Sequence, residues 1–183
     1  MVQAASGGSS APLVVVMGVS GAGKTTVAAP LAAHLGVDYG EADEFHPPSN
    51  IAKMASGRPL DDADREPWLR AIGAWLAAHE DRGAVATCSA LKRRYRDILR
   101  AAAPETVFLH LTGDRDVIEE RMGHRSGHFM PTSLLTSQLQ TLEPLEPDEA
   151  GLEADLTQPP EVIVAEFVTW LKDRKVQRSP AHE

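Results

Sequence analysis

Hydrophobic and polar residues are arranged so that strands and helices alternate along almost the whole chain. Uninterrupted apolar runs, such as 13–17, are typical of strands buried on both faces of a sheet. Longer segments with apolar residues three and four positions apart, such as 64–80, are typical of amphipathic helices. This alternation predicts an α/β fold with a parallel sheet. The predicted strands are 13–17, 37–43, 84–88, 106–111 and 152–156, and the predicted helices are 24–35, 50–55, 64–80, 91–101, 114–122, 133–142 and 160–172.

The length of 183 residues fits one α/β domain. We expect this domain to span residues 12–174, with a flexible N-terminal tail at 1–11 and a C-terminal tail at 175–183. Within the first helix, Pro30 should cause a bend, and Gly36 supplies the stop.

The net charge and the cysteine content exclude several kinds of binding partner and covalent link. A formal net charge of −8 argues against broad adsorption to nucleic acid or to an anionic membrane, so an anion site must be local. The single cysteine, Cys88, has no second thiol with which to form a disulfide or metal cluster. The chain start lacks the features of a signal peptide, and no apolar run is long enough to span a bilayer. We therefore expect a cytoplasmic protein that binds neither nucleic acid nor membrane.

A glycine-rich motif follows the first predicted strand and opens the first predicted helix. It matches G-x-x-x-x-G-K-[ST], a phosphate-binding loop (P-loop) whose backbone N–H groups surround phosphates at a helix N-terminus. Lys24 should reach the β- and γ-phosphates of ATP and is a candidate catalytic residue, and the Thr25 hydroxyl should bind Mg²⁺. The residues expected to bind the nucleotide here are Gly18, Val19, Ser20, Gly21, Ala22, Gly23, Lys24, Thr25 and Thr26.

The loop predicts nucleotide binding better than it predicts phosphoryl transfer, because switches and mechanical ATPases use the same loop. A guanine-reading N-K-x-D motif is absent, since the stretch 50–53 has the wrong order. The apolar run 84–88 is followed by Ser89 and not by the acidic residue expected of a mechanical ATPase. Both rival classes are therefore weakened.

Asp43 falls at the end of the second predicted strand, on the sheet edge where the phosphate loop also opens and where ligands bind in such folds. Its carboxylate could accept the proton of a reacting hydroxyl or hold Mg²⁺. The simpler interpretation of an acidic residue at this place is a loop cap.

The most specific stretches of the chain are 43–54, 57–69, 88–97 and 127–131. These four segments closely resemble the gluconokinase family, and the resemblance covers almost all of residues 13–170. It implies a five-stranded P-loop kinase fold with a mobile lid, similar to shikimate and nucleoside monophosphate kinases. It also implies transfer from ATP to the 6-hydroxyl of D-gluconate, which gives 6-phospho-D-gluconate, and a homodimer. A kinase for another small hydroxy acid such as shikimate, or a nucleotide switch without a small acceptor, are the alternatives.

Gluconate requires cations for its carboxylate and polar groups for its hydroxyls, and the resembling segments offer both. Arg65 and Lys92 are the favoured cations for the carboxylate, whereas Arg93 and Arg94 fit a solvated helix face. The substrate-binding candidates are Asp43, His46, Lys53, Arg58, Asp62, Arg65, Lys92, Arg96 and His128.

A segment at about 121–131 occupies the place of the lid. Arg121 is expected to stack on adenine, and Arg125 to stabilise the charge on the transferring phosphoryl group as a catalytic residue. Single arginines are more often simple surface charges. Elsewhere, Trp68, Trp75 and Trp170 are interpreted as core or dimer contacts and Cys88 as buried filler.

Overall fold

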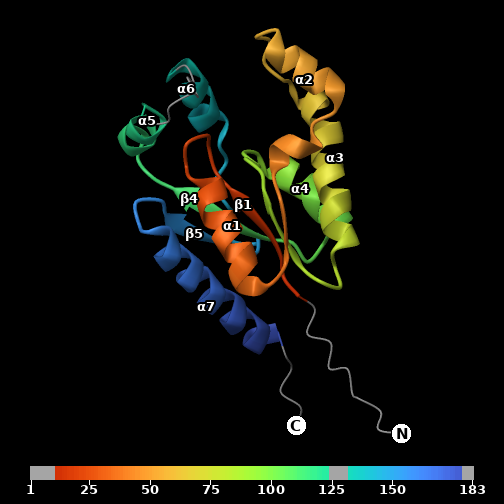
Figure 1. The fold of residues 1–183 in the computed structure, drawn as a ribbon, viewed down its shortest axis with the longest axis vertical. Helices are drawn as coiled ribbons and strands as arrows, with labels where there is room; N and C mark the ends of the chain where they lie inside the picture. Colours follow the sequence, from red (N-terminus) through yellow and green to blue (C-terminus); the bar gives the residue numbers. More distant parts are fainter. Residues whose placement is uncertain (1–10, 124–131, 179–183) are drawn as a thin grey trace, which may run out of the picture.

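The computed structural model describes residues 11–123 and 132–178, and within them five strands form one parallel sheet (Figure 1). The strand order is β2-β3-β1-β4-β5, and every adjacent pair is parallel. This confirms the predicted α/β fold with five parallel strands. The strands are β1 (Leu13–Met17), β2 (Asp38–Gly40), β3 (Ala84–Thr87), β4 (Val107–Thr112) and β5 (Gly151–Asp155).

Every predicted helix is present, with ends that differ by a few residues. The helix α1 (Lys24–Leu35) has the predicted bounds because glycines with positive φ stand at both ends, Gly23 at 92° and Gly36 at 67°. It continues through Pro30. The other helices are η1 (Ala42–Phe45), α2 (Pro48–Ala55), α3 (Asp62–Ala78), α4 (Arg93–Ala102), α5 (Arg115–Gly123), α6 (Thr132–Thr141) and α7 (Pro160–Arg178).

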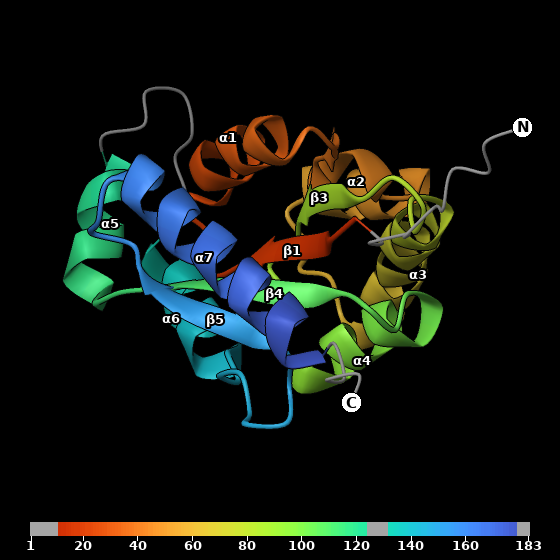
Figure 2. The ribbon, with the colours of Figure 1, turned by 90° about the horizontal axis from the view of Figure 1, so that it is seen from below.

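Two cores lie on opposite faces of the sheet (Figures 1 and 2). On one face, α1 and α7 cover alternate strand residues such as Val14 and Leu109. On the other, α3 and α4 cover residues of the opposite register such as Val15 and Phe108. Because both faces are covered, β1 is buried throughout, which explains its uninterrupted apolar sequence.

Two predicted boundaries are wrong. Helix α7 runs to Arg178, so residues 175–178 belong to the domain and not to a C-terminal tail. Strand β2 ends at Gly40, and Asp43 lies on the short 3₁₀ helix η1. The N–H of Ala42 donates to the Thr87 hydroxyl, which takes the backbone out of the strand ladder. The predicted N-terminal tail lies, apart from Ala11, outside the described residues.

The carboxyl ends of the strands form the edge on which the functional groups gather. Strand β1 lies between β3 and β4, and the chain moves from one side of it to the other, so a crevice is expected where the strand order reverses. The phosphate loop leaves β1 at this edge, with α2, α5 and α6 beyond it (Figure 1). Among the described helices, none combines the length and apolar character needed to cross a membrane.

Candidate active site

The phosphate loop adopts a closed turn between β1 and α1. Its tight path requires left-handed backbone at Gly21 and Gly23, whose φ angles are 82° and 92°. The Lys24 side chain folds back over the loop, and its Nζ donates to the carbonyl oxygens of Gly18 at 3.0 Å and Val19 at 3.2 Å. The ammonium charge is thereby held beside the backbone amides that would bind phosphate.

Glu41 stands next to this loop and was missed by the sequence reasoning. It directly follows β2, so it is the acidic residue at the strand end, the position predicted for Asp43. Its carboxylate accepts hydrogen bonds from the hydroxyls of Thr25 at 2.9 Å and Thr87 at 3.0 Å, and from the hydroxyl of Tyr39. Burial alone would raise the pKa of Glu41, but these three hydroxyls and the charge of Lys24 hold it below its ordinary value. Glu41 is therefore a fixed negative charge beside the phosphate loop.

The pair formed by Thr25 and Glu41 suits a hard cation. A hydroxyl oxygen and a carboxylate oxygen 2.9 Å apart are the donor types that Mg²⁺ prefers. No group of three or more acidic, His or Cys side chains that could enclose a metal is found within 11–123 and 132–178.

A cavity of about 560 Å³ opens beside the phosphate loop. It lies between the start of α1, helix α5 and the turn that joins β5 to α7, and Arg121 is part of its wall. The Arg121 guanidinium donates to the carbonyl of Leu156 and lies close to Gly23. The cavity wall combines apolar side chains with a few polar groups, which is the composition usual for a small-molecule site.

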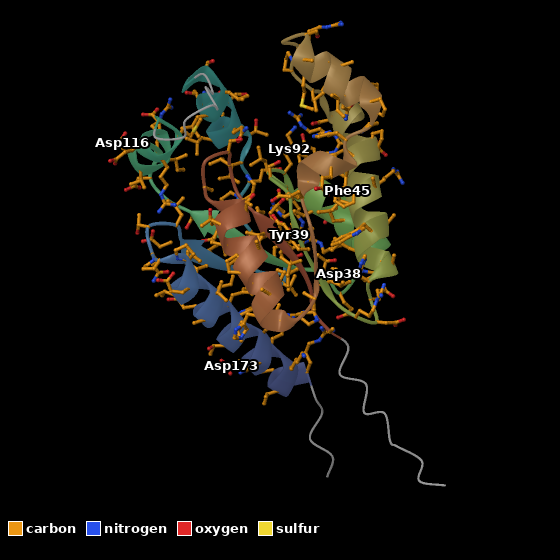
Figure 3. The ribbon with its side chains drawn as sticks, viewed as in Figure 1. Asp38, Tyr39, Phe45, Lys92, Asp116 and Asp173 are labelled. Atoms are coloured by element: carbon orange, nitrogen blue, oxygen red, sulfur yellow. The ribbon has the colours of Figure 1, made fainter. Side chains whose placement is uncertain are left out.

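Across the carboxyl edge, three cations surround one carboxylate. Lys92 Nζ lies 3.2 Å from Asp62, Arg94 lies 3.1 Å from it, and Arg65 lies 3.8 Å from it. The Tyr95 hydroxyl also donates to Asp62, and this bond together with the Lys92 ammonium keeps the pKa of Asp62 below its ordinary value. The cluster carries a positive excess, so it can accept a further anion. Figure 3 shows Lys92 at the same end of the molecule as α2 and α6.

The predicted residues Asp43 and His46 lie together on the acceptor side. The His46 ring stacks on Trp68 with centroids 4.5 Å apart, and its Nδ1 lies 3.3 Å from the Asn50 amide. Burial and the nearby Arg65 lower the pKa of His46, while Asp43 opposes them. The Asp43 carboxylate is exposed and accepts no hydrogen bond from the described residues. Asp43 is thus accessible to an incoming hydroxyl.

The other residues predicted to bind the substrate differ in how far their side chains are already paired within the protein. Lys53 is paired with Asp64 on α3, whereas Arg58 is exposed and its side chain donates to the hydroxyl of Ser56. Arg93 is held by Glu146 and Asp148, so it is not the freely solvated residue that was expected. Arg125 and His128 lie outside the described residues.

Arg96 was predicted to bind substrate, and this prediction is wrong. Its side chain is fully buried, and all three guanidinium nitrogens bond to protein: Nε and NH2 to Glu149, and NH1 to the carbonyl of Ala90 at 2.9 Å. Ala90 has a φ of 45°, a left-handed conformation uncommon for a residue with a side chain. Arg96 therefore supports the turn that precedes Lys92.

The tryptophans and the cysteine behave as expected of core residues. Trp68 is buried, and Trp75 and Trp170 are half-buried against neighbouring aromatic residues. Cys88 is fully buried, and burial raises the pKa of its thiol to about 12, so it is unreactive.

Comparisons with known proteins agree on one group of kinases. Residues 20–170 match the family model described as shikimate kinase. The gluconokinase of Gluconobacter oxydans is 48% identical over 160 residues, which cover 85% of this chain and 88% of that protein. The thermoresistant gluconokinase of Escherichia coli is 43% identical, with 89% of this chain and 95% of that protein covered.

Solved structures give the same picture. The crystal structure of a gluconokinase from Sinorhizobium meliloti has a TM-score of 0.83 and 45% identity, over 92% of this chain and 98% of that one. Shikimate kinase from Aquifex aeolicus, at 14% identity with a TM-score of 0.60 over 89% of this chain and 98% of that one, shares the fold.

Proposed function

The chain belongs to the gluconokinase family, and from this premise we propose that it transfers the γ-phosphoryl group of ATP to the 6-hydroxyl of D-gluconate. The product is 6-phospho-D-gluconate. The observation that carries the proposal is the position of a half-exposed cation cluster, Lys92 with Arg65 and Arg94, at the same sheet edge as the phosphate loop. A sugar acid needs such a cluster for its carboxylate, whereas a neutral sugar does not.

On the nucleotide side, the P-loop amides and Lys24 bind the β- and γ-phosphates, and Arg121 lines the cavity for the base. The Lys24 ammonium offsets the charge that develops on the transferring group. Thr25 and Glu41 would hold Mg²⁺, which neutralises phosphate charge when it is bound. Glu41 thus takes the role of Mg²⁺ ligand that the sequence suggested for Asp43.

On the acceptor side, Lys92 and Arg65 bind the carboxylate, and Asp43 accepts the proton of the attacking hydroxyl. In this proposal His46 and Arg58 contact the sugar hydroxyls, while Lys53 orients α2 through Asp64. An Asp43→Asn variant should lower kcat about 100-fold with a smaller change in the KM for gluconate, because a general base acts in the transition state. An unchanged kcat would return Asp43 to the role of a loop cap.

Roles for Arg125 in stabilising the transition state and for His128 in substrate binding remain predictions, as does a lid at about 121–131. So do assembly as a homodimer and a cytoplasmic location. The buried free thiol of Cys88 agrees with a reducing compartment, and light scattering after size exclusion would measure the oligomeric state.

One assay separates the proposed function from its rivals. ADP release is coupled to NADH oxidation in the presence of ATP and Mg²⁺, with gluconate, shikimate, glucose or no acceptor. We expect rapid ADP release in the sample that contains gluconate and slow release in the other three. Preference for shikimate would favour the wider family whose model the chain matches. Release that is equal in all four samples would indicate a nucleotide-driven switch or an ATPase.

A further inference from the structure

One side chain from a distant helix is bonded to the backbone of the phosphate loop. The N–H of Ser20 donates to Oε1 of Gln138 at 2.7 Å, and Nε2 of Gln138 donates to Oγ of Ser20 at 3.1 Å. Gln138 lies on α6, 118 positions further along the chain. Because the two hydrogen bonds run in opposite directions, they fix both the place and the orientation of the amide relative to the loop.

The same stretch of chain also reaches the acceptor side. At the end of α6, the N–H of Leu142 donates to the carbonyl of Gln138 at 2.9 Å. The next residue, Glu143, donates its N–H to the carbonyl of Leu91 at 2.7 Å, immediately before Lys92. Residues 138–143 therefore contact the phosphate loop at one end and the turn that presents Lys92 at the other.

That turn is held in an unusual conformation. Ala90 adopts a φ of 45°, and the carbonyl of Ser89 accepts the N–H of Gly18 at 3.3 Å. A left-handed residue with a side chain persists only where its surroundings fix it. The bond from Glu143 to Leu91 is one restraint on this turn and the direct bond from Gly18 is another, so the segment that Gln138 anchors contributes to the spacing between loop and turn.

We propose that Gln138 is a positioning residue for phosphoryl transfer, which holds Ser20 so that the phosphate loop and the acceptor turn keep a fixed spacing. The inference rests on the proposed function. In the reaction, the acceptor oxygen forms a bond to the γ-phosphorus, the bond to the leaving ADP oxygen breaks, and the hydroxyl proton passes to a base. This in-line approach is sensitive to distance, and a displacement of about 1 Å can cost about 100-fold in rate. If the loop shifts, water can replace the acceptor and release inorganic phosphate.

The first test compares Gln138→Ala with Gln140→Ala, which removes an exposed glutamine from the same helix. For Gln138→Ala we expect kcat to fall about tenfold or more, with the KM for gluconate changed by less than about threefold. The ratio of ADP formed to gluconate phosphorylated should rise above that of wild type. The melting temperature should stay within about 5 °C of wild type. A kcat and a product ratio equal to those of Gln140→Ala would overturn the proposal.

The second test does not depend on turnover. Binding of a non-hydrolysable ATP analogue is measured by calorimetry for wild type, Ser20→Ala, Gln138→Ala and the double variant. We expect Gln138→Ala to weaken binding about three- to tenfold, and Ser20→Ala to have an effect only when Gln138 is present. Additive effects would show that Ser20 and Gln138 act independently, and tighter binding by Gln138→Ala would show that the glutamine competes with phosphate for the Ser20 amide; either result would overturn the proposal.

The two proposals can fail separately. If wild type does not phosphorylate gluconate but the binding cycle shows coupling, the proposed function is wrong and the link between Ser20 and Gln138 stands. If gluconate is phosphorylated and the cycle shows no coupling, the proposed function stands and the positioning role is wrong.

Discussion

Helix α4 and the residue before it carry basic side chains that serve two different purposes. Lys92 and Arg94 face Asp62 at the edge of the sheet, with 32% and 61% of their side chains exposed. Arg96 is fully buried against Glu149. Lys92 and Arg96 are one helical turn apart and both are cations paired with a carboxylate. Charge and spacing alone therefore do not distinguish a residue that can bind a ligand from one that supports the fold.

The difference lies in how many donors remain for a ligand. All three guanidinium nitrogens of Arg96 donate hydrogen bonds within the protein, to the carboxylate of Glu149 and to the carbonyl of Ala90 in the turn. Lys92 bonds to Asp62 and lies 5.6 Å from the centre of the Tyr95 ring, and 32% of its side chain is exposed to solvent. The buried pair has lost its hydration and depends on its partner, whereas the exposed cluster keeps water that a substrate carboxylate can replace.

The largest expected effect comes from breaking the buried pair. Glu149→Gln preserves shape but leaves the charge of Arg96 without its counter-ion, so the free energy of unfolding should fall by about 3–5 kcal/mol. Urea denaturation measures this, with Asp148→Asn as the control, because that exposed carboxylate pairs with Arg93. A loss below about 1 kcal/mol would mean that the pair is not desolvated as the structure indicates.

The same pair predicts a pH dependence. Burial alone would raise the pKa of Glu149, but hydrogen bonds from Arg96, the backbone of residue 146 and Arg100 lower it from an ordinary 4.5 to about 2. Because the folded-state pKa is depressed, the stabilisation is complete above 4.5 and is lost as pH falls towards 2. The full shift corresponds to on the order of 3 kcal/mol.

Unfolding free energies measured between about pH 6 and pH 3 check this prediction. The difference between wild type and Glu149→Gln should shrink by about half over that range, since other carboxylates titrate in both proteins and cancel. A difference that stays constant would show that the Glu149 carboxylate does not titrate with a depressed pKa.

The sequence contained a signal for the burial of Arg96 that the prediction did not use. Arg96 lies between Tyr95 and Leu99, two buried residues that mark the inner face of α4. A cation at such a position needs a buried counter-ion. That counter-ion, Glu149, comes from a loop more than 50 positions away, and single-sequence patterns carry no information about that pairing.

The acidic residue beside the phosphate loop was misplaced for a related reason. The phosphate loop and α1 were predicted correctly because glycines and local periodicity determine them. The end of β2 depends instead on tertiary contacts, since a Cβ at Gly40 would lie 3.0 Å from the Trp75 ring and Ala42 bonds to Thr87. These contacts end the strand before Glu41, so Glu41 and not Asp43 reaches Thr25.

Removal of Lys92, the cation that we expect to bind the substrate, should have a smaller effect, and the effect should be on catalysis and not on stability. Lys92→Gln should lower kcat/KM for gluconate about 10- to 100-fold, because one charge-assisted contact is worth about 1.5–3 kcal/mol. The free energy of unfolding should change by less than about 1 kcal/mol, since the pair with Asp62 is half-exposed. Steady-state kinetics and urea denaturation test this, with Lys172→Gln, an exposed lysine on α7, as the control. If Lys92→Gln instead lowered the free energy of unfolding by more than about 1 kcal/mol and left kcat/KM unchanged, Lys92 would support the fold and would not bind the substrate.

The smallest effect should come from Arg94, which shares the partner of Lys92 but is mostly exposed. Its guanidinium lies 3.1 Å from Asp62, a distance like that of Lys92, so any difference between the two variants reports solvent exposure and not geometry. Exposed ion pairs contribute about 0–1 kcal/mol, and salt screens them over about 8–10 Å. Arg94→Gln should therefore lower kcat/KM for gluconate by less than about threefold at low salt, and the effect should disappear near 0.5 M NaCl, where that of Lys92→Gln persists. Steady-state kinetics of both variants at low salt and near 0.5 M NaCl test this difference. A salt-resistant loss for Arg94→Gln comparable to that of Lys92→Gln would mean that Arg94 contacts the substrate directly and that exposure in the absence of ligand does not predict the role of a cation here.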